Sequence, residues 1–363
     1  MLCGLALALV ACSAPSKPAS YGLAQPQQQL DSRLRKIADV PSGPNTYTVH
    51  CATPSVCWVG DSSNQWRTDD GGQHWQLIYS SKSDGSQINT VDYVDAQVAW
   101  ILTVQKLLKT EDGGRTWVEQ PRPLPDYTRG ELRSIKFLQN GKIGWAGGGI
   151  YRPLTKEEET IGTPRNISDP PSHTILRPAV AYTENGGKTW IPQSIPNNAG
   201  RVSGFTFLDE QQGLAFESSG LFYTKNGGNE WKRVDFKKSC TNEKYLEGYD
   251  MSPLEVFFLD SRNAWLTFED GRIAKSTDGG LSWCDLLASD SVKFDYYEKY
   301  FKTIYFSDSL HGFGLGANRQ VYETIDGGKT WNKAMDTRAD DMFFLDNHTG
   351  WLVSKDGLFQ IAL

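Results

Sequence analysis

The chain contains six copies of one eight-residue pattern, each of which ends in tryptophan. The pattern is S/T-x-D/N-x-G-x-x-W, and the six copies end at Trp75, Trp117, Trp190, Trp231, Trp283 and Trp331. Most steps from one tryptophan to the next are about 40 to 50 residues long. A repeat of this length around a Gly-rich turn is typical of stacked four-stranded units. The octets therefore predict an all-β chain folded as a β-propeller.

The third residue of each octet is an Asp or Asn: Asp70, Asp112, Asn185, Asn226, Asp278 and Asp326. Such a side chain accepts hydrogen bonds from backbone N–H groups further along the same turn, and the glycines allow a positive φ at the tip. The tryptophan then begins the next strand and offers a large apolar face for packing. We expect a structural role for the octets, because propeller symmetry would hold their carboxylates too far apart for catalysis.

A second pattern lies between the octets, and it counts one unit more. Seven stretches consist of two short apolar runs joined by a polar turn, which is typical of a hairpin. The seventh unit ends after its third strand, and residues 33–41 (RLRKIADVP) are similar to the segments that follow each tryptophan. We therefore predict seven blades over residues 31–363, with the N-terminal strand completing the last blade, since closure protects strand edges.

The first residues predict export. Residues 1–11 contain an apolar run that is too short to cross a bilayer, and LVAC at residues 9–12 resembles a bacterial lipobox. The resemblance implies a signal peptide over 1–11 and a lipid on Cys12. Residues 12–30 are rich in Pro, Ser and Gln, which predicts a disordered tether. We expect a lipid anchor in the bacterial envelope, at the outer membrane facing the periplasm; a plain signal peptide is the alternative.

Apart from Cys3 in the expected signal peptide and Cys12, four cysteines are present: Cys51, Cys57, Cys240 and Cys284. An even number in an exported protein favours disulfides. Cys51 and Cys57 flank one hairpin turn and are expected to pair, which leaves Cys240 for Cys284; buried free thiols are the alternative. The sequence has no C-x-x-C motif or Cys/His cluster, so we expect no metal and no cofactor.

The charge balance weighs against a nucleic-acid partner. The chain carries 37 Lys and Arg against 43 Asp and Glu, for a net charge of −6. Nucleic-acid binding depends on clustered positive charge, which this composition does not favour. We expect a monomer.

The octets resemble the Asp-box, or bacterial neuraminidase repeat. The family of photosystem II stability/assembly factors combines such octets with a hairpin pattern. This chain resembles that family in the octet TIDGGKTW (324–331) and the hairpin FLDNHTGW (344–351). The resemblance implies a single seven-bladed propeller and a role in assembling a membrane complex. Members in photosynthetic organisms carry an Arg-rich patch for a membrane-protein partner. Here the arginines are dispersed and the chain is acidic, which favours an envelope role outside photosynthesis.

Three long insertions, residues 151–178, 235–252 and 285–300, are expected on one face of the ring. Function tends to be carried by loops on a rigid scaffold. They bring five tyrosines, a favoured interface residue: Tyr245, Tyr249, Tyr296, Tyr297 and Tyr300. We therefore expect a non-catalytic lipoprotein that binds an envelope or membrane protein; the alternative for the tyrosines is packing within their own loops.

Two other functions remain open. A sialidase-like glycoside hydrolase would carry an Arg triad, a Tyr nucleophile and an R-I/L-P motif. The sequence has neither R-I-P nor R-L-P, and Arg152-Pro153 and Arg177-Pro178 lack the middle residue. A glycan-binding propeller is the third possibility. We expect no catalytic residues.

Overall fold

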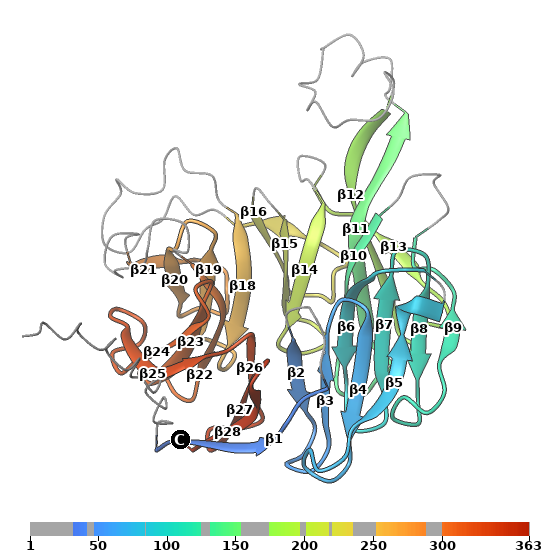
Figure 1. Ribbon diagram of the computed structural model, residues 1–363. Coiled ribbons are helices and arrows are strands. Elements are labelled where there is room, and N and C mark those ends of the chain that lie inside the picture. Colours follow the sequence, from blue (N-terminus) through green and yellow to red (C-terminus); the bar gives the residue numbers. More distant parts are fainter. Residues whose placement is uncertain are drawn as a thin grey trace, which may run out of the picture.

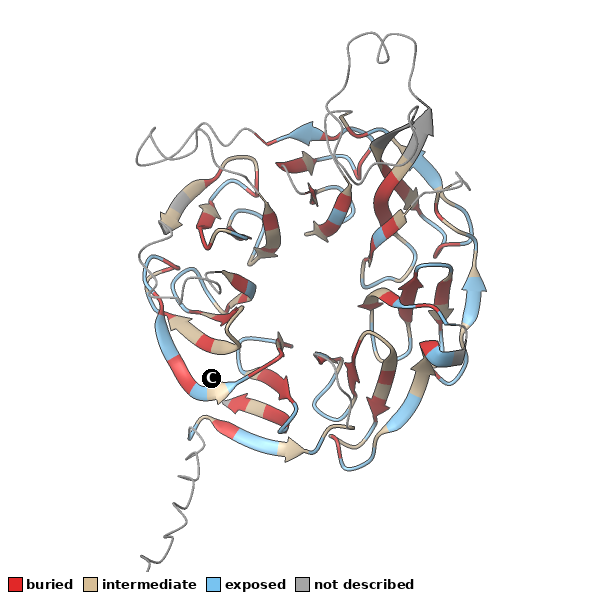
Figure 2. Cartoon of the chain, turned by 45° about the horizontal axis from the view of Figure 1, so that its top comes forward, coloured by how far each residue is buried: buried red, intermediate tan, exposed pale blue. Residues whose placement is uncertain are grey.

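The computed structural model describes residues 32–41, 47–83, 85–124, 131–153, 174–196, 201–217, 220–234, 252–287 and 300–362. These residues form seven antiparallel sheets of four strands each. Figure 2 shows the sheets arranged as the blades of a ring. The predicted seven-bladed β-propeller is confirmed.

The blades are numbered in chain order from β2. Blade 1 consists of β2 (Thr48–Cys51), β3 (Cys57–Gly60), β4 (Asn64–Thr68) and β5 (Gln76–Ser80). Blade 2 consists of β6 (Ile88–Tyr93), β7 (Ala99–Thr103), β8 (Leu107–Thr110) and β9 (Val118–Gln120). Blade 3 consists of β10 (Glu131–Phe137), β11 (Gly144–Pro153), β12 (Thr174–Thr183) and β13 (Ile191–Gln193). Blade 4 consists of β14 (Val202–Phe207), β15 (Gly213–Glu217), β16 (Gly220–Thr224) and β17 (Lys232–Arg233).

The remaining three blades follow the same order. Blade 5 consists of β18 (Pro253–Phe258), β19 (Ala264–Phe268), β20 (Ile273–Ser276) and β21 (Cys284–Leu287). Blade 6 consists of β22 (Phe301–Phe306), β23 (Gly312–Gly316), β24 (Gln320–Thr324) and β25 (Asn332–Arg338). Blade 7 consists of β26 (Asp341–Phe344), β27 (Thr349–Ser354), β28 (Gly357–Ala362) and β1 (Leu34–Ala38).

The N-terminal strand closes the ring, as predicted. Strand β1 pairs with β28, and Leu34 lies opposite Ile361 in the register. Leu34 is buried in the same core cluster as Ile361 and Phe359. Beyond the strand, the Trp75 indole N–H donates to the carbonyl of Asp39 at 2.9 Å, so the first octet holds β1 from the neighbouring blade.

Aromatic stacking joins neighbouring blades. The tryptophan on the second strand of one blade stacks on the phenylalanine that ends the first strand of the next blade. Three of these contacts have centroid distances of 4.2, 3.4 and 3.7 Å, for Trp100–Phe137, Trp145–Phe207 and Trp265–Phe306. These three tryptophans are fully buried. Offset aromatic pairs contribute beyond their buried area, so the hairpin pattern in the sequence encodes the packing between blades.

The antiparallel order sorts the connections onto two faces. The turn between the first and second strands and the octet lie on one face, called the octet face. The other connections lie on the opposite face, called the insertion face, from which β11 and β12 extend at the top of Figure 1. Since the C-terminal end of β28 and the start of β1 replace an octet in blade 7, both lie on the octet face.

The described residues contain no helix that is long and apolar enough to cross a membrane, and their helical content is the short turn η1 (Ser81–Ser83). Within the same ranges, no group of three or more His, Cys, Asp or Glu side chains is placed to hold a metal ion.

Candidate functional site

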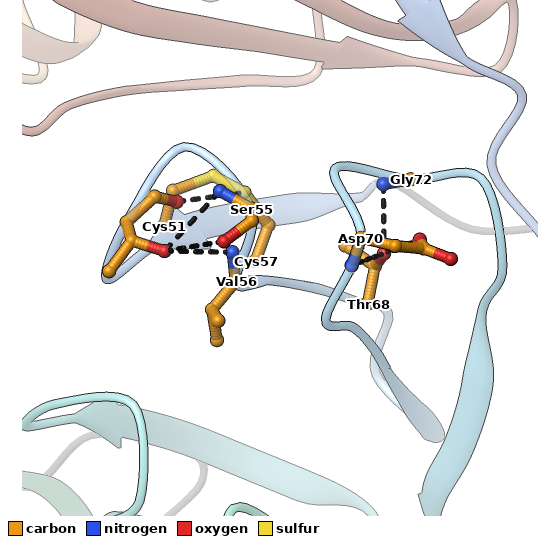
Figure 3. Close-up of a disulfide and its surroundings, with 8 residues drawn as sticks. Cys51, Ser55, Val56, Cys57, Thr68, Asp70 and Gly72 are labelled. Atoms are coloured by element: carbon orange, nitrogen blue, oxygen red, sulfur yellow. Dashed lines mark hydrogen bonds between the residues drawn. A yellow bond between two sulfur atoms is a disulfide. The ribbon is translucent and has the colours of Figure 1, made fainter.

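Each octet satisfies its own polar groups. In the first, the Gly72 N–H donates to the Thr68 hydroxyl at 2.8 Å, and that hydroxyl donates to Asp70 (Figure 3). Asp70 also accepts the backbone N–H of His74 at 2.9 Å. In the second octet, equivalent bonds from Thr116 lower the pKa of Asp112 to about 2. These carboxylates are therefore engaged in holding their turns.

In blades 1 to 6, the two turns on the octet face are also tied together. The first glycine of every octet donates its N–H to a carbonyl of the hairpin turn in the same blade. In blade 1 the bond runs from Gly71 to Ser55 at 2.9 Å, and in blade 6 from Gly327 to Leu310 at 2.8 Å. A positive φ at the glycine, 70° at Gly71, makes this approach possible. The octets thus brace the inner hairpins that surround the centre of the ring.

The first of those hairpins carries a disulfide. Cys51 and Cys57 are bonded, with their Cα atoms 4.0 Å apart, as the sequence predicts (Figure 3). Cys284 is also disulfide-bonded. Its expected partner, Cys240, lies outside the described residues, so that pairing stays a prediction.

Most of the predicted interface residues also lie outside the described ranges: Tyr245, Tyr249, Tyr296 and Tyr297, as well as the lipidation site Cys12. Tyr300 is described. It precedes β22, is partly buried, and its carbonyl accepts the Ala317 N–H at 2.8 Å. The predicted tyrosine surface therefore stays a prediction, and the site below is built from the described residues.

A large cavity lies at the centre of the octet face. It has a volume of about 1070 Å³ and is lined by the inner hairpins of blades 1, 2, 3, 4 and 7. A second cavity, of about 550 Å³, reaches toward the insertion face between blades 1 and 2. The same four side chains line both cavities: His50, Tyr93, Lys136 and Phe343. We call the two cavities together the channel.

One position of the first strand recurs around the channel. It immediately precedes the residue that packs against the previous blade, and we call its seven occupants the channel ring. The ring consists of His50, Asp92, Lys136, Thr206, Phe257, Tyr305 and Phe343. Four of them line the two cavities: His50, Asp92, Lys136 and Phe343. Blades 5, 6, 7 and 1 contribute aromatic side chains, whereas blades 2, 3 and 4 contribute an acid, a base and a hydroxyl. The ring is therefore apolar on one side and polar on the other.

The aromatic side of the ring contains two pairs of neighbouring aromatic side chains. The rings of His50 and Phe343 lie 4.3 Å apart, and those of Phe257 and Tyr305 lie 5.3 Å apart. Burial lowers the pKa of His50 to about 3, and the Lys136 charge adds to this effect. His50 is consequently neutral at physiological pH and behaves as one more aromatic face.

The polar side of the ring contains an ion pair. Lys136 lies 2.8 Å from Asp92, which is largely buried. The second oxygen of Asp92 accepts the Phe137 N–H at 2.6 Å, so this carboxylate also joins blade 2 to blade 3. Charge-assisted bonds of this kind are stronger than neutral ones.

Two other inner-strand carboxylates join blades in the same way. Asp341 accepts the Val49 N–H at 3.0 Å, from blade 7 to blade 1. Glu255 accepts the Ile304 N–H at 3.1 Å, from blade 5 to blade 6. Burial raises the pKa of Glu255 to about 8 and that of Asp341 to about 6, because the charged form loses water.

The raised pKa of Glu255 makes stability depend on pH. Because its folded pKa lies above the usual 4.5, folding takes up a proton; the stabilisation is complete below about pH 4.5 and is lost as pH rises through about 8. Relative to Glu255→Gln, the wild type should lose at least about 1 kcal/mol of unfolding free energy between pH 5 and pH 9. Glutamine mimics the protonated acid and can still bond Thr303 and Ile304. Urea titrations of both proteins at pH 5, 7 and 9 test this, and parallel pH curves would contradict it.

The channel ring is missing from the expectations drawn from the sequence, although a signal for it exists. Its residues are visible only when the seven hairpins are aligned on the last residue of the first strand. The residue type at this position varies between blades, from Phe to Asp, so no sequence motif marks it. Its shared location comes from the fold, because propeller symmetry brings the first strand of every blade to the central axis.

The fold and this central site define the chain as a seven-bladed β-propeller with a closed ring and a polarised channel. No protein-family model matches the sequence. The chain is 21% identical over 216 residues to the photosystem II stability/assembly factor HCF136 of Oryza sativa subsp. japonica, a match over 53% of this chain and 50% of that protein. It is 36% identical over 61 residues to the photosystem II assembly lipoprotein Ycf48 of Synechococcus sp. (strain CC9902), covering 15% and 18% of the two chains.

Solved structures agree on the fold. The structure titled "YCF48 bound to D1 peptide" superposes with a TM-score of 0.58 at 18% identity, over 90% of this chain and 99% of that one. YCF48 from Cyanidioschyzon merolae gives 0.61 at 15% identity, over 91% and 99%. An ancestral GH74 enzyme gives 0.56 at 11% identity, over 88% and 45%. The chain is homologous to the photosystem II assembly factors HCF136 and Ycf48, and it spans about half the length of the first curated relative.

Proposed function

We propose that this chain is a non-catalytic propeller that binds a segment of a protein partner in the channel mouth on the octet face, as an assembly or stability factor for a membrane complex. The observation that carries the proposal is the cavity of about 1070 Å³, which is wide and is held open by braced hairpins. Its mouth carries aliphatic side chains beside carboxylates, including Leu138, Leu208 and Leu345. Homology to assembly factors supports it, and a solved relative is titled as bound to a peptide.

Two of the channel carboxylates are already engaged in contacts that favour binding over hydrolysis. Glycoside hydrolases need one carboxyl group free to give a proton and a second free to act as base or nucleophile. Here Asp92 holds Lys136 and a backbone N–H, and Asp341 accepts two backbone N–H groups, from Val49 and Met342. Hydrolysis of a sialoside by the pure protein would instead support the hydrolase alternative.

Site-directed photo-crosslinking tests the position of the partner. A photoreactive residue in place of Leu345, which is 40% exposed at the channel mouth, should capture one membrane protein reproducibly in cells. The matched control replaces Leu77, which is 52% exposed on the outer strand β5. We expect position 345 to give at least about ten times more of this product than position 77, because a photoreactive side chain reacts only with a partner that it touches.

The same experiment separates the channel from the insertion face. In a Tyr296→Ala, Tyr297→Ala, Tyr300→Ala background, crosslinking from position 345 should persist. Equal yields from positions 345 and 77 would contradict the channel as the site. Loss of the product in the folded triple variant would move the binding surface to the predicted tyrosine loops.

We also propose that the propeller is held in the bacterial envelope by a lipid on Cys12. Cys12→Ser should shift the protein almost completely from the membrane fraction to the soluble fraction, because the chain would lose its acyl anchor. Fractionation with a high-salt wash, followed by immunoblotting, measures this. Ser13→Ala is the control and should stay with the membrane. Retention of the Cys12→Ser protein after the wash would refute the anchor.

A further inference from the structure

The channel is lined by an excess of negative charge. Among the described residues, Lys136 is the one cationic side chain that lines the two cavities. Six carboxylates line them: Asp61, Asp92, Asp95, Asp209, Glu210 and Asp341. Asp95, Asp209 and Glu210 are exposed at the mouth. Low-dielectric walls concentrate such a field and raise the local concentration of a cationic ligand.

One of these carboxylates has an oxygen in need of a donor. Asp61 is 5% exposed and lines the channel between blades 1 and 2. Its Oδ1 accepts the N–H groups of Ser63 and Asn64, each at 2.7 Å. Its Oδ2 is buried and has no hydrogen-bond partner among the described residues. A buried carboxylate oxygen without a partner is costly, and because this atom has almost no accessible surface, an arriving donor would reach it only if the Asp61 side chain turned toward the cavity.

The aromatic side of the channel ring suits a particular kind of cation. His50 and Phe343 place aromatic rings against both cavities, and the neutral state of His50 spares an incoming cation from repulsion. A guanidinium group is planar, stacks on aromatic faces and presents five donors in a fork that fits carboxylates. An ammonium group shares the charge but lacks the planar stacking surface.

We infer that the channel mouth takes a basic segment of the protein partner, with an arginine side chain stacked against the aromatic side of the channel ring and its donors directed to the carboxylates. This inference rests on the proposed function and adds the chemistry of the partner. The exposed carboxylates at the mouth would attract the segment, and the ring would select arginine over lysine.

Calorimetric titration with three peptides tests this inference: Ac-Gly-Arg-Gly-Arg-Gly-NH2 and the same sequence with Lys or Glu in place of Arg. We expect the Arg peptide to bind at least about threefold more tightly than the Lys peptide, through stacking, and the Glu peptide to show no binding. The paired variant Asp209→Asn, Glu210→Gln should weaken Arg-peptide binding at least about fivefold, as should Phe343→Leu.

The control removes the same charge elsewhere. Glu119→Gln with Glu230→Gln alters two exposed carboxylates on the outer part of blades 2 and 4, and should leave binding within about twofold of the wild type. Melting curves establish that every variant is folded. Equal binding of the Arg and Glu peptides, an equal loss in the control, or no Arg-peptide binding would overturn the inference. If the peptide titrations fail and crosslinking from position 345 succeeds, the proposed function stands without the arginine inference. If both experiments fail, the proposed function and the inference are both wrong.

Discussion

Deletion of residues 31–41 is expected to unfold the whole ring. These residues include β1, the outer strand of blade 7, which pairs with β28 from Leu34 to Ala38. Without β1, the apolar side chains of the last blade lose their cover and β28 becomes an exposed edge. The loss should reach several kcal/mol, a large part of the about 5 to 15 kcal/mol that stabilises a typical domain.

The contacts of β1 explain why the effect should spread beyond blade 7. Arg33 donates to Glu323 at 2.7 Å and to the carbonyl of Ala334, both in blade 6. On the other side, the carbonyl of Asp39 accepts the Trp75 indole N–H of blade 1. The strand therefore bridges three blades, and its removal opens the ring at its point of closure.

Circular dichroism melts of the deletion variant measure the effect. A deletion of residues 13–30, the predicted tether, is the control and should leave the melting temperature unchanged. Adding a synthetic peptide of residues 31–41 should restore part of the lost stability in a saturable manner, because the peptide can pair with β28. A deletion variant with the wild-type melting temperature would contradict ring closure by β1.

Closure and blade number were predictable because they depend on repeated local signals. Each octet marks one turn through its glycine pair and tryptophan, and each hairpin marks one inner pair of strands. The count of seven hairpins against six octets located the missing strand, and the similarity of residues 33–41 to the other outer strands supplied it. These turn residues recur in the six blades whose third and fourth strands are joined by an octet, because those blades make the same turn.

The channel was not predictable in the same way, because it depends on how the blades face one another. Lys136 meets Asp92, and His50 meets Phe343, across blade boundaries. No spacing within one repeat indicates these pairs. The sequence instead predicted an interface on the tyrosine-bearing insertions, because the length and composition of a loop can be read without knowing the fold. Within this chain the scaffold repeats from blade to blade, whereas the ring residues vary, so the site is specified separately from the fold.

Replacing Trp265 by alanine should produce the second large loss of stability. Trp265 is fully buried on β19, and its ring stacks on Phe306 of the next blade at 3.7 Å. Its indole N–H donates to the carbonyl of Gly327, in the octet of that blade, at 2.9 Å. Truncation of a buried tryptophan costs about 3 to 5 kcal/mol. We expect the melting temperature to fall by about 4 to 7 °C, since a domain of this size has a large unfolding entropy.

A pair of phenylalanine variants isolates the hydrogen bond within that loss. Trp100 is the equivalent residue of blade 2: it is fully buried and stacks on Phe137, but its indole N–H has no acceptor among the described residues. Both variants lose three ring atoms and a lysine contact with the indole face, whereas Trp265→Phe also loses the hydrogen bond to Gly327. Trp265→Phe should therefore cost about 1 to 2 kcal/mol more than Trp100→Phe.

Urea denaturation of the two variants and the wild type measures this difference. A larger loss in Trp265→Phe would show that the hairpin tryptophan anchors the octet of the next blade, which would explain why the two motifs recur together along the chain. Equal losses would mean that stacking alone joins the blades and that the bond to Gly327 contributes nothing measurable. A mild Trp265→Ala variant would contradict the packing between blades 5 and 6 described above.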